Sequence, residues 1–380
     1  MVGFFPTAAR PSRRSDFSKP SYPIYQLANR FNPKTIPSLG RRFIGAVKLL
    51  AHSTDETFGK QSSGFRDEAH PSAVPVKYRS YIPVRHSQIR YYRRVPLYSE
   101  TAPDVFHLYK PVGVELNQHQ FDEDRHPRLF IQQSDRMEAI REVHKGFNQD
   151  IARSMETGDV TSVKSALCDL MAETLAEPRA GMLQALPATM DVLVSGYSKQ
   201  PGILRTFATI SSKDYSTVIH SVNVMALTLS YAFFTGLSMR DTKRLGLAAL
   251  LHDVGKTGIP SEIIWAPRKL TAAEFEIIKS HPTIGGRLIR EISRLGDDIA
   301  AGALEHHEKL DGSGYPLGTR EISFNGQVIG IVDCYEALTN EERPYRRARD
   351  PMDTLKLIKE DVEAGKFSRQ LFEKFCYCLI

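Results

Sequence analysis

The spacing of apolar positions changes along this chain, and each change predicts a different kind of structure. Residues 1–75 show no sustained apolar period and are rich in Ser, Pro, Lys and Arg, which is typical of a disordered segment. Short apolar runs between turn residues follow over 76–134 and predict the strands of a small β-rich domain. From Ser134 the spacing becomes helical, which predicts a helical connector over 135–212 and an all-helical domain over 213–380. The predicted fold class is therefore mainly α.

Helix-breaking and helix-capping residues divide the helical part into segments. Pro178, Pro187 and Pro201 are expected to separate helices within 161–210, because a proline inside a helix removes a backbone hydrogen bond and crowds the preceding turn. Further along, Ser238 is placed to cap the amphipathic sequence "MRDTKRLGLAALLHD". The apolar face of that helix ends at a histidine and an aspartate.

The amino-acid composition does not change the predicted fold class, but its charge distribution indicates which partners to expect. The 380 residues are 41% hydrophobic and 25% charged, as in an ordinary soluble globular protein. Residues 1–95 hold 17 Lys and Arg against 5 Asp and Glu, whereas residues 96–380 hold 33 against 39. We interpret the basic end as a solvated tail without a specific nucleic-acid partner. Charges and prolines interrupt the apolar stretches, which predicts no transmembrane segment. The four cysteines lack CxxC spacing, as expected for reduced thiols in a cytoplasmic protein.

The sequence "LLHDVGKTGIP" at 250–260 carries the first candidate chemistry. Its Gly-Lys-Thr resembles the end of a phosphate-binding P-loop, but that loop needs a glycine five positions before Gly255, where this chain has Leu250. We therefore exclude a P-loop. A helix that ends in His252 and Asp253 offers instead an imidazole and a carboxylate, which are ligands for divalent metal ions.

Further histidines recur through the C-terminal helices. A lone histidine on an apolar helix, such as His220, is more often a core residue than a ligand. Asp333, in the apolar sequence "VIGIVDCYEALT", could likewise pair with an arginine. A buried carboxylate is costly without a cation, however, and several such residues share one predicted domain. The candidate metal ligands are His220, His252, Asp253, His281, His306, His307 and Asp333.

These residues stand in motifs that resemble those of the HD-GYP family, within the HD phosphohydrolase superfamily. The motifs are "HDVGKTGIP", "LTAAEFEIIKSHPTIGGRLI", "HHEKLDGSGYP" and "ALTNEERPYRRA", and the resemblance covers about 214–380. The family hydrolyses the bacterial second messenger cyclic di-GMP at a two- or three-metal centre in a helical domain. The resemblance therefore implies an HD-superfamily domain at 213–380 and a cyclic di-GMP phosphodiesterase active in signal transduction.

Carried over onto this sequence, the resemblance implies that the seven residues bind metal ions and that Asp253 bridges two of them. It also implies that Lys256 holds a phosphate oxygen of the substrate, and that Arg343 and Arg346 contact the phosphates of the dinucleotide. The reaction would be attack of a metal-bridging hydroxide on phosphorus, since bound cations lower the pKa of water toward about 7. Iron or manganese are the expected ions.

One position sets the expected number of metal ions. In trinuclear members of the family a glutamate four residues before the first histidine adds a ligand, and this chain has Ser216 there. A serine hydroxyl is a much weaker ligand than a carboxylate. We therefore expect two metal ions per chain, and hydrolysis mainly to the linear dinucleotide pGpG.

Two departures from the family pattern bear on substrate binding. The chain reads "WAPRK" where the family has "KPG", and "NEE" where it has two residues before "RPYR". The second departure displaces Arg343 and Arg346. It keeps open a cyclic di-GMP-responsive binding module with weak turnover. Another HD-superfamily nucleotide phosphohydrolase is a further alternative, which the "DGSGYP" loop disfavours. GGDEF-domain or other signalling proteins at the Gly-Tyr-Pro loop, and a homodimer, are hypotheses for partners.

Overall fold

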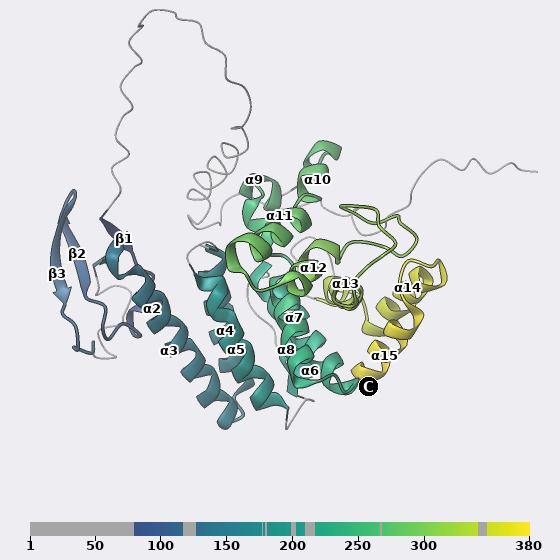
Figure 1. Ribbon diagram of the computed structural model, residues 1–380, viewed down its shortest axis with the longest axis horizontal. Coiled ribbons are helices and arrows are strands. Elements are labelled where there is room, and N and C mark those ends of the chain that lie inside the picture. The colour runs from purple at the N-terminus through teal and green to yellow at the C-terminus, as the bar shows by residue number, and fades with distance from the viewer. Residues whose placement is uncertain are drawn as a thin grey trace, which may run out of the picture.

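The structure, a computed structural model, is mainly helical with a small sheet at one end (Figure 1). The predicted basic segment 1–75 lies outside the residues that the structure describes. Those residues are 80–116, 127–176, 178, 181–198, 203–209, 217–266, 268–340 and 348–380.

The sheet is antiparallel and has four strands in the order β1-β4-β2-β3. Leu129 and Ile131 are buried on one face of β4, while Phe130 between them stands opposite Tyr98 on the other face. All three side chains are buried, which agrees with the short apolar run that predicted a strand here. A short helix, α2 (His86–Ile89), was not predicted. The strands are β1 (Tyr81–Pro83), β2 (Leu97–Ala102), β3 (Val105–Lys110) and β4 (Leu129–Gln132).

The described part of the helical connector is helical, with Pro178 between two helices as predicted and Pro201 outside the described residues. Pro187 lies inside α5, so the prediction that it separates two helices is wrong. Proline removes only its own N–H from the ladder, and the buried side chains of Leu186 and Met190 on either side of it hold the helix in the core. The connector helices are α3 (Arg136–Glu156), α4 (Val160–Ala176), α5 (Met182–Tyr197) and α6 (Ile203–Thr209).

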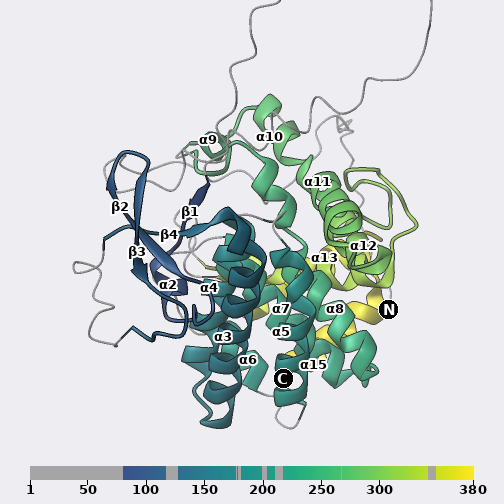
Figure 2. The same ribbon diagram turned by 60° about the vertical axis from the view of Figure 1, so that its left-hand side comes forward.

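Helices α7 and α8 pack against each other, with α6, α12 and α13 beside them and the connector helices α4 and α5 on the other side (Figures 1 and 2). Ser238 caps α8 as predicted, because its hydroxyl accepts the N–H of Asp241. The helices are α7 (Thr217–Phe234), α8 (Met239–Leu251), η5 (Val254–Gly258), α9 (Ser261–Ile264), α10 (Ala272–Ile278), α11 (His281–Arg287), the π-helical η6 (Leu288–Ser293), α12 (Asp297–Glu305), α13 (Phe324–Thr339), α14 (Pro351–Glu363) and α15 (Arg369–Leu379).

A single hydrophobic core runs from the sheet through the connector to the last helix. At its centre, α7 has the length and composition of a membrane span, but 78% of its apolar window is buried among the other helices, which is the position of a core helix. The connector also meets the C-terminal part by charge, since Lys243 on α8 pairs with Asp191 on α5 at 2.7 Å. The predicted division into separate domains stays a prediction.

Candidate metal centre

Helix ends bring the predicted ligands together in the interior. His220 lies on α7, and His252 and Asp253 follow the last residue of α8. His281 is the first residue of α11, and His306 directly follows α12. All five side chains are buried. His307 and Asp333, on the far side of the cluster, retain exposed fractions of 20% and 14%.

Two triads of ligand atoms form within this cluster. In each triad the atoms lie within 4.8 Å of one another, which is the spacing of ligands around one metal ion. Among the residues that the structure describes, the triads are His220, His252 and Asp253, and His281, His306 and His307. Asp333 lies beside both, because one of its oxygens is 3.0 Å from Nε2 of His220 and the other is 4.0 Å from Nδ1 of His307.

A repeated hydrogen bond sets the orientation of three histidines. Nδ1 of His252, His281 and His306 lies 2.7, 2.7 and 2.9 Å from the carbonyl oxygen three residues earlier in the chain. A carbonyl only accepts, so Nδ1 carries the proton and Nε2 presents its lone pair.

The Nε2 atoms of these rings face one another across short distances. Nε2 of His252 is 3.2 Å from Nε2 of His220, and Nε2 of His281 is 3.3 Å from Nε2 of His306. In the His281–His306 pair both Nε2 atoms present lone pairs, and two lone pairs at such a distance repel unless a cation lies between or beside them. Nε2 of His220 also lies 3.0 Å from the carboxylate of Asp333. The donor set therefore fits divalent metal ions of the kind that imidazole and carboxylate bind.

The carboxylate of Asp253, which belongs to the first triad, also faces two histidines of the second triad. Its Oδ2 is 3.6 and 3.5 Å from Nε2 of His220 and His252, whereas its Oδ1 is 3.2 and 3.9 Å from Nε2 of His281 and His306. Oδ1 is buried and accepts no hydrogen bond within the described part of the chain. A buried oxygen in that state is costly, and a bound cation would satisfy it.

Electrostatics keeps the carboxylates of the cluster ionised. Burial alone would raise the pKa of Asp253, but the ammonium of Lys256 and the ring of His252 outweigh burial and hold that pKa well below its usual range. The pKa of Asp333 is also low, because the hydrogen bond from His220 overcomes the effect of burial. Both groups are therefore charged at neutral pH.

Burial keeps His306 and His307, which follow α12, neutral. It lowers the pKa of His306 and of His307 well below the usual value, and the neighbouring histidines lower it further. A neutral imidazole is the form that binds a metal ion.

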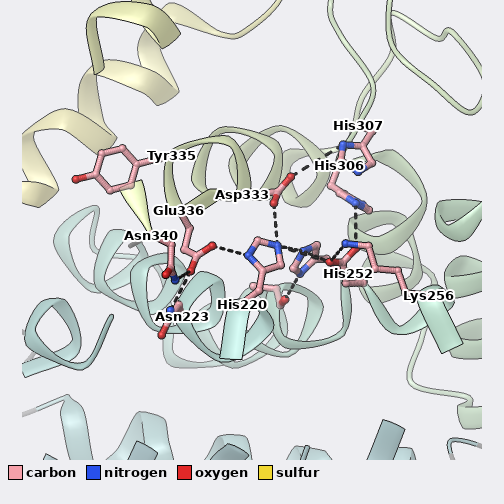
Figure 3. A network of polar contacts seen from close by, with 12 residues as sticks. His220, Asn223, His252, Lys256, His306, His307, Asp333, Tyr335, Glu336 and Asn340 are labelled. Atoms are coloured by element: carbon pink, nitrogen blue, oxygen red, sulfur yellow. Dashed lines mark hydrogen bonds and ion pairs between the residues drawn. The ribbon is translucent and has the colours of Figure 1, made fainter. Parts of the chain in front are cut away.

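Glu336 is a functional residue that the sequence analysis missed. Its Oε2 is 2.5 Å from Nδ1 of His220, and its Oε1 accepts hydrogen bonds from Asn223 at 2.9 Å and Asn340 at 2.6 Å (Figure 3). Burial would lower the pKa of His220, but the carboxylates of Glu336 and Asp333 raise it to about 9. A carboxylate behind a histidine ligand fixes the ring and increases its basicity. In the sequence, Glu336 could have been noticed because it stands three residues after Asp333 on the same predicted helix.

The structure places two of the three predicted substrate contacts outside its described residues. Arg343 and Arg346 belong to that undescribed part, as does Ser216. Lys256 lies on η5, with 28% of its side chain exposed, and its ammonium pairs with Oδ2 of Asp253. Lys256 therefore lies at the edge of the cluster, where part of its side chain reaches solvent.

Comparison with protein families places the cluster in a known domain. Residues 205–371 match the model of a family described as HD domain. A solved structure, an HD-GYP-type protein, Bd1817, from Bdellovibrio bacteriovorus, has a TM-score of 0.50 at 18% identity, covering 78% of this chain and 98% of that one. This likeness concerns the fold alone and agrees with the predicted mainly helical class.

Curated relatives are similar over the same region. A protein named cyclic di-GMP phosphodiesterase PA4108, from Pseudomonas aeruginosa, is 33% identical over 49% of this chain and 45% of its own length. A cyclic di-GMP phosphodiesterase from Thermotoga maritima is 37% identical over 43% of this chain and 45% of its own. A 3'3'-cGAMP-specific phosphodiesterase from Vibrio cholerae is 33% identical over 43% of this chain and 38% of its own. The aligned part thus spans less than half the length of each of these relatives.

Proposed function

We propose that this chain is a metal-dependent phosphodiesterase that hydrolyses cyclic di-GMP, because residues 205–371 match the HD domain family and carry the motifs that resemble HD-GYP proteins. The observation that carries the proposal is the pair of opposed Nε2 contacts on either side of Asp253. The names of the relatives from Pseudomonas and Thermotoga support cyclic di-GMP as the substrate.

The seven clustered side chains would hold two divalent ions, iron or manganese, with Asp253 between them. Ions bound there would lower the pKa of a coordinated water toward about 7 and offset negative charge on the phosphoryl oxygens. Glu336 would keep the ring of His220 in place through Nδ1. Asp333, between the two triads, would contribute a second carboxylate to the site.

Lys256 would bind the scissile phosphate. Its ammonium already lies at the edge of the cluster, paired with Asp253, and part of the side chain reaches solvent. A lysine in such a position acts on a phosphate as a point charge. Arg343 and Arg346, which the structure leaves undescribed, are proposed as further phosphate contacts from the sequence resemblance alone.

We propose pGpG as the main product. Each of the two triads would hold one ion, and the count of two rests on Ser216, which lies outside the described residues. The relative from Vibrio cholerae named as specific for 3'3'-cGAMP makes that cyclic dinucleotide the second candidate substrate.

Turnover by anaerobically purified protein tests the proposal. The protein is loaded with Mn²⁺ or Fe²⁺, mixed with cyclic di-GMP or 3'3'-cGAMP, and the products are separated by chromatography. We expect pGpG from cyclic di-GMP, and no product after the metal is removed by a chelator. Binding of cyclic di-GMP without hydrolysis would support the receptor alternative. Hydrolysis of 3'3'-cGAMP alone would reassign the substrate, and hydrolysis of neither would overturn the proposal.

A further inference from the structure

The loop that follows the histidine pair is held by a buried carboxylate that the proposed chemistry does not use. Glu308 is 3% exposed. Its Oε1 accepts the backbone N–H of Leu317 at 2.6 Å, and its Oε2 accepts the backbone N–H of Thr319 at 3.2 Å. Both oxygens therefore bind the backbone of the loop.

The Gly-Tyr-Pro part of the loop lies directly on the backbone beside Glu308. A Cβ atom added to Gly314 would stand only 2.4 Å from Cα of Glu308 and from the backbone nitrogen of Lys309. The N–H of Tyr315 donates to the carbonyl oxygen of His307 at 3.3 Å. Only a glycine permits this approach of the two backbone segments. It places the side chain of the next residue, Tyr315, beside His307.

That side chain, Tyr315, stacks on the ring of His307. The two ring centroids are 4.6 Å apart and the planes meet at 29°. His307 differs from the other histidines of its triad, whose Nδ1 atoms donate to backbone carbonyls. Its own Nδ1 lies 4.0 Å from a carboxylate oxygen of Asp333. Stacking on Tyr315 therefore orients the ring of His307, whereas a backbone hydrogen bond orients the rings of His281 and His306.

We infer that Glu308 is a positioning residue for the metal centre, acting through the loop and Tyr315 on the ring of His307. This inference rests on the proposed function, because it takes His307 to be a metal ligand. Outer groups that orient metal ligands typically change metal affinity or activity by about 10- to 100-fold when they are replaced.

A matched control stands on the other side of the histidine pair. Glu305 also accepts a loop N–H, that of Ser323 at 2.7 Å, but with one oxygen only. Glutamine at 305 keeps an oxygen for that bond. Glutamine at 308 has one oxygen for two N–H groups, so its amide NH₂ must oppose a backbone N–H.

Metal titration without substrate tests the inference. Metal-free wild type, Glu308→Gln and Glu305→Gln are titrated with Mn²⁺, and amide exchange of the loop is followed by mass spectrometry. We expect Glu308→Gln to weaken one bound ion by about 10- to 100-fold and to speed exchange at Leu317 and Thr319, while Glu305→Gln matches wild type. Wild-type affinity for every ion in a folded Glu308→Gln protein would overturn the inference.

A second pair of variants covers the case in which Glu308→Gln does not fold. Tyr315→Leu removes the ring but leaves both bonds of Glu308, whereas Tyr315→Phe keeps the ring. The first should weaken the same ion, and the second should not. Equal affinities in the two variants would also overturn the inference. Neither measurement uses a nucleotide, so failure of cyclic di-GMP hydrolysis in wild type would count against the proposed function alone.

Discussion

In each buried histidine of the cluster, one ring nitrogen bonds to the surrounding protein and the other faces the candidate metal site. In His252, His281 and His306 the Nδ1 atom belongs to a helix end and the Nε2 atom faces the centre. His144 on α3 is different, because it is 4% exposed and neither ring nitrogen has a hydrogen-bond partner within the described residues. Burial lowers its pKa from 6.5 to about 4. The same side chain thus faces a candidate metal site in one place and is a neutral core group in another.

His144 predicts a loss of stability in acid. Above pH 6.5 the ring is neutral in both the folded and the unfolded state and contributes no pH dependence. Between pH 6.5 and about 4 the unfolded chain gains a proton that the folded chain does not, so the free energy of unfolding falls by up to about 3 kcal/mol. Denaturant unfolding at pH 7 and pH 4.5 measures this. His144→Leu should lose less stability than wild type over that interval, and an equal loss in both proteins would show that His144 is not the cause.

Lys256 predicts a kinetic effect without loss of metal. Lys256→Ala should lower kcat/KM by about 10²-fold, because one charge that stabilises the phosphoryl oxygens is removed. Metal content should be unchanged, since the ammonium is not a ligand. Lys243→Ala, which removes another Asp-paired lysine at a distance from the cluster, is the control and should keep wild-type kinetics. Loss of metal from Lys256→Ala would instead make the lysine a structural partner of Asp253.

The clustering of the candidate ligands was predictable from sequence because these residues have distinctive types and spacings. The structure brings all seven predicted ligands together. Glu336 and Glu308 were not predicted, since a glutamate on a helix or next to a loop is usually a solvated residue. Their roles depend on which groups face them in three dimensions, and a residue pattern does not contain that information.

At the scale of elements, the close approach of η5 and α11 is what brings His281 to Asp253. A Cβ atom on Gly255 would stand 1.9 Å from the carbonyl oxygen of His281 and 2.5 Å from the backbone nitrogen of Gly285. The glycine of "HDVGK" is therefore required by packing between two backbones. The sequence motif contained this residue, but only the fold gives its reason.

Gly255 predicts a packing defect that reaches the site. Gly255→Ala must separate η5 from α11, which we expect to cost about 1–3 kcal/mol of unfolding free energy and to weaken metal binding. Gly258→Ala is the matched control, because its added Cβ would meet only the side chain of Ile284, at 3.0 Å. Thermal unfolding and Mn²⁺ titration compare the two. Equal stability and affinity in both variants would contradict the packing role of Gly255.

Element boundaries were predicted well where local chemistry decides them. Ser238 precedes α8 and accepts the N–H of Asp241 as its capping hydrogen bond. Pro187 was misjudged because tertiary packing of α5 outweighs the local preference of proline. The short α2 carries no side-chain cap that would have marked it in the sequence.

At the scale of the whole molecule, the sheet, the connector and the C-terminal helices share one core. Periodicity predicts the elements but not that they pack into one continuous body, because that depends on which apolar faces meet. The basic segment 1–75, a homodimer and contacts of signalling proteins with the Gly-Tyr-Pro loop remain predictions from sequence. Localisation in the cytoplasm is likewise a prediction.

The central claim is that Asp253 joins two metal subsites, and titration of metal-free protein with Mn²⁺ tests it most directly. Wild type should bind two ions per chain. Asp253→Asn preserves the size of the side chain but removes its charge, so it should stay folded and bind both ions at least about tenfold more weakly. Normal binding of both ions by a folded Asp253→Asn protein, or three ions in wild type, would contradict the account.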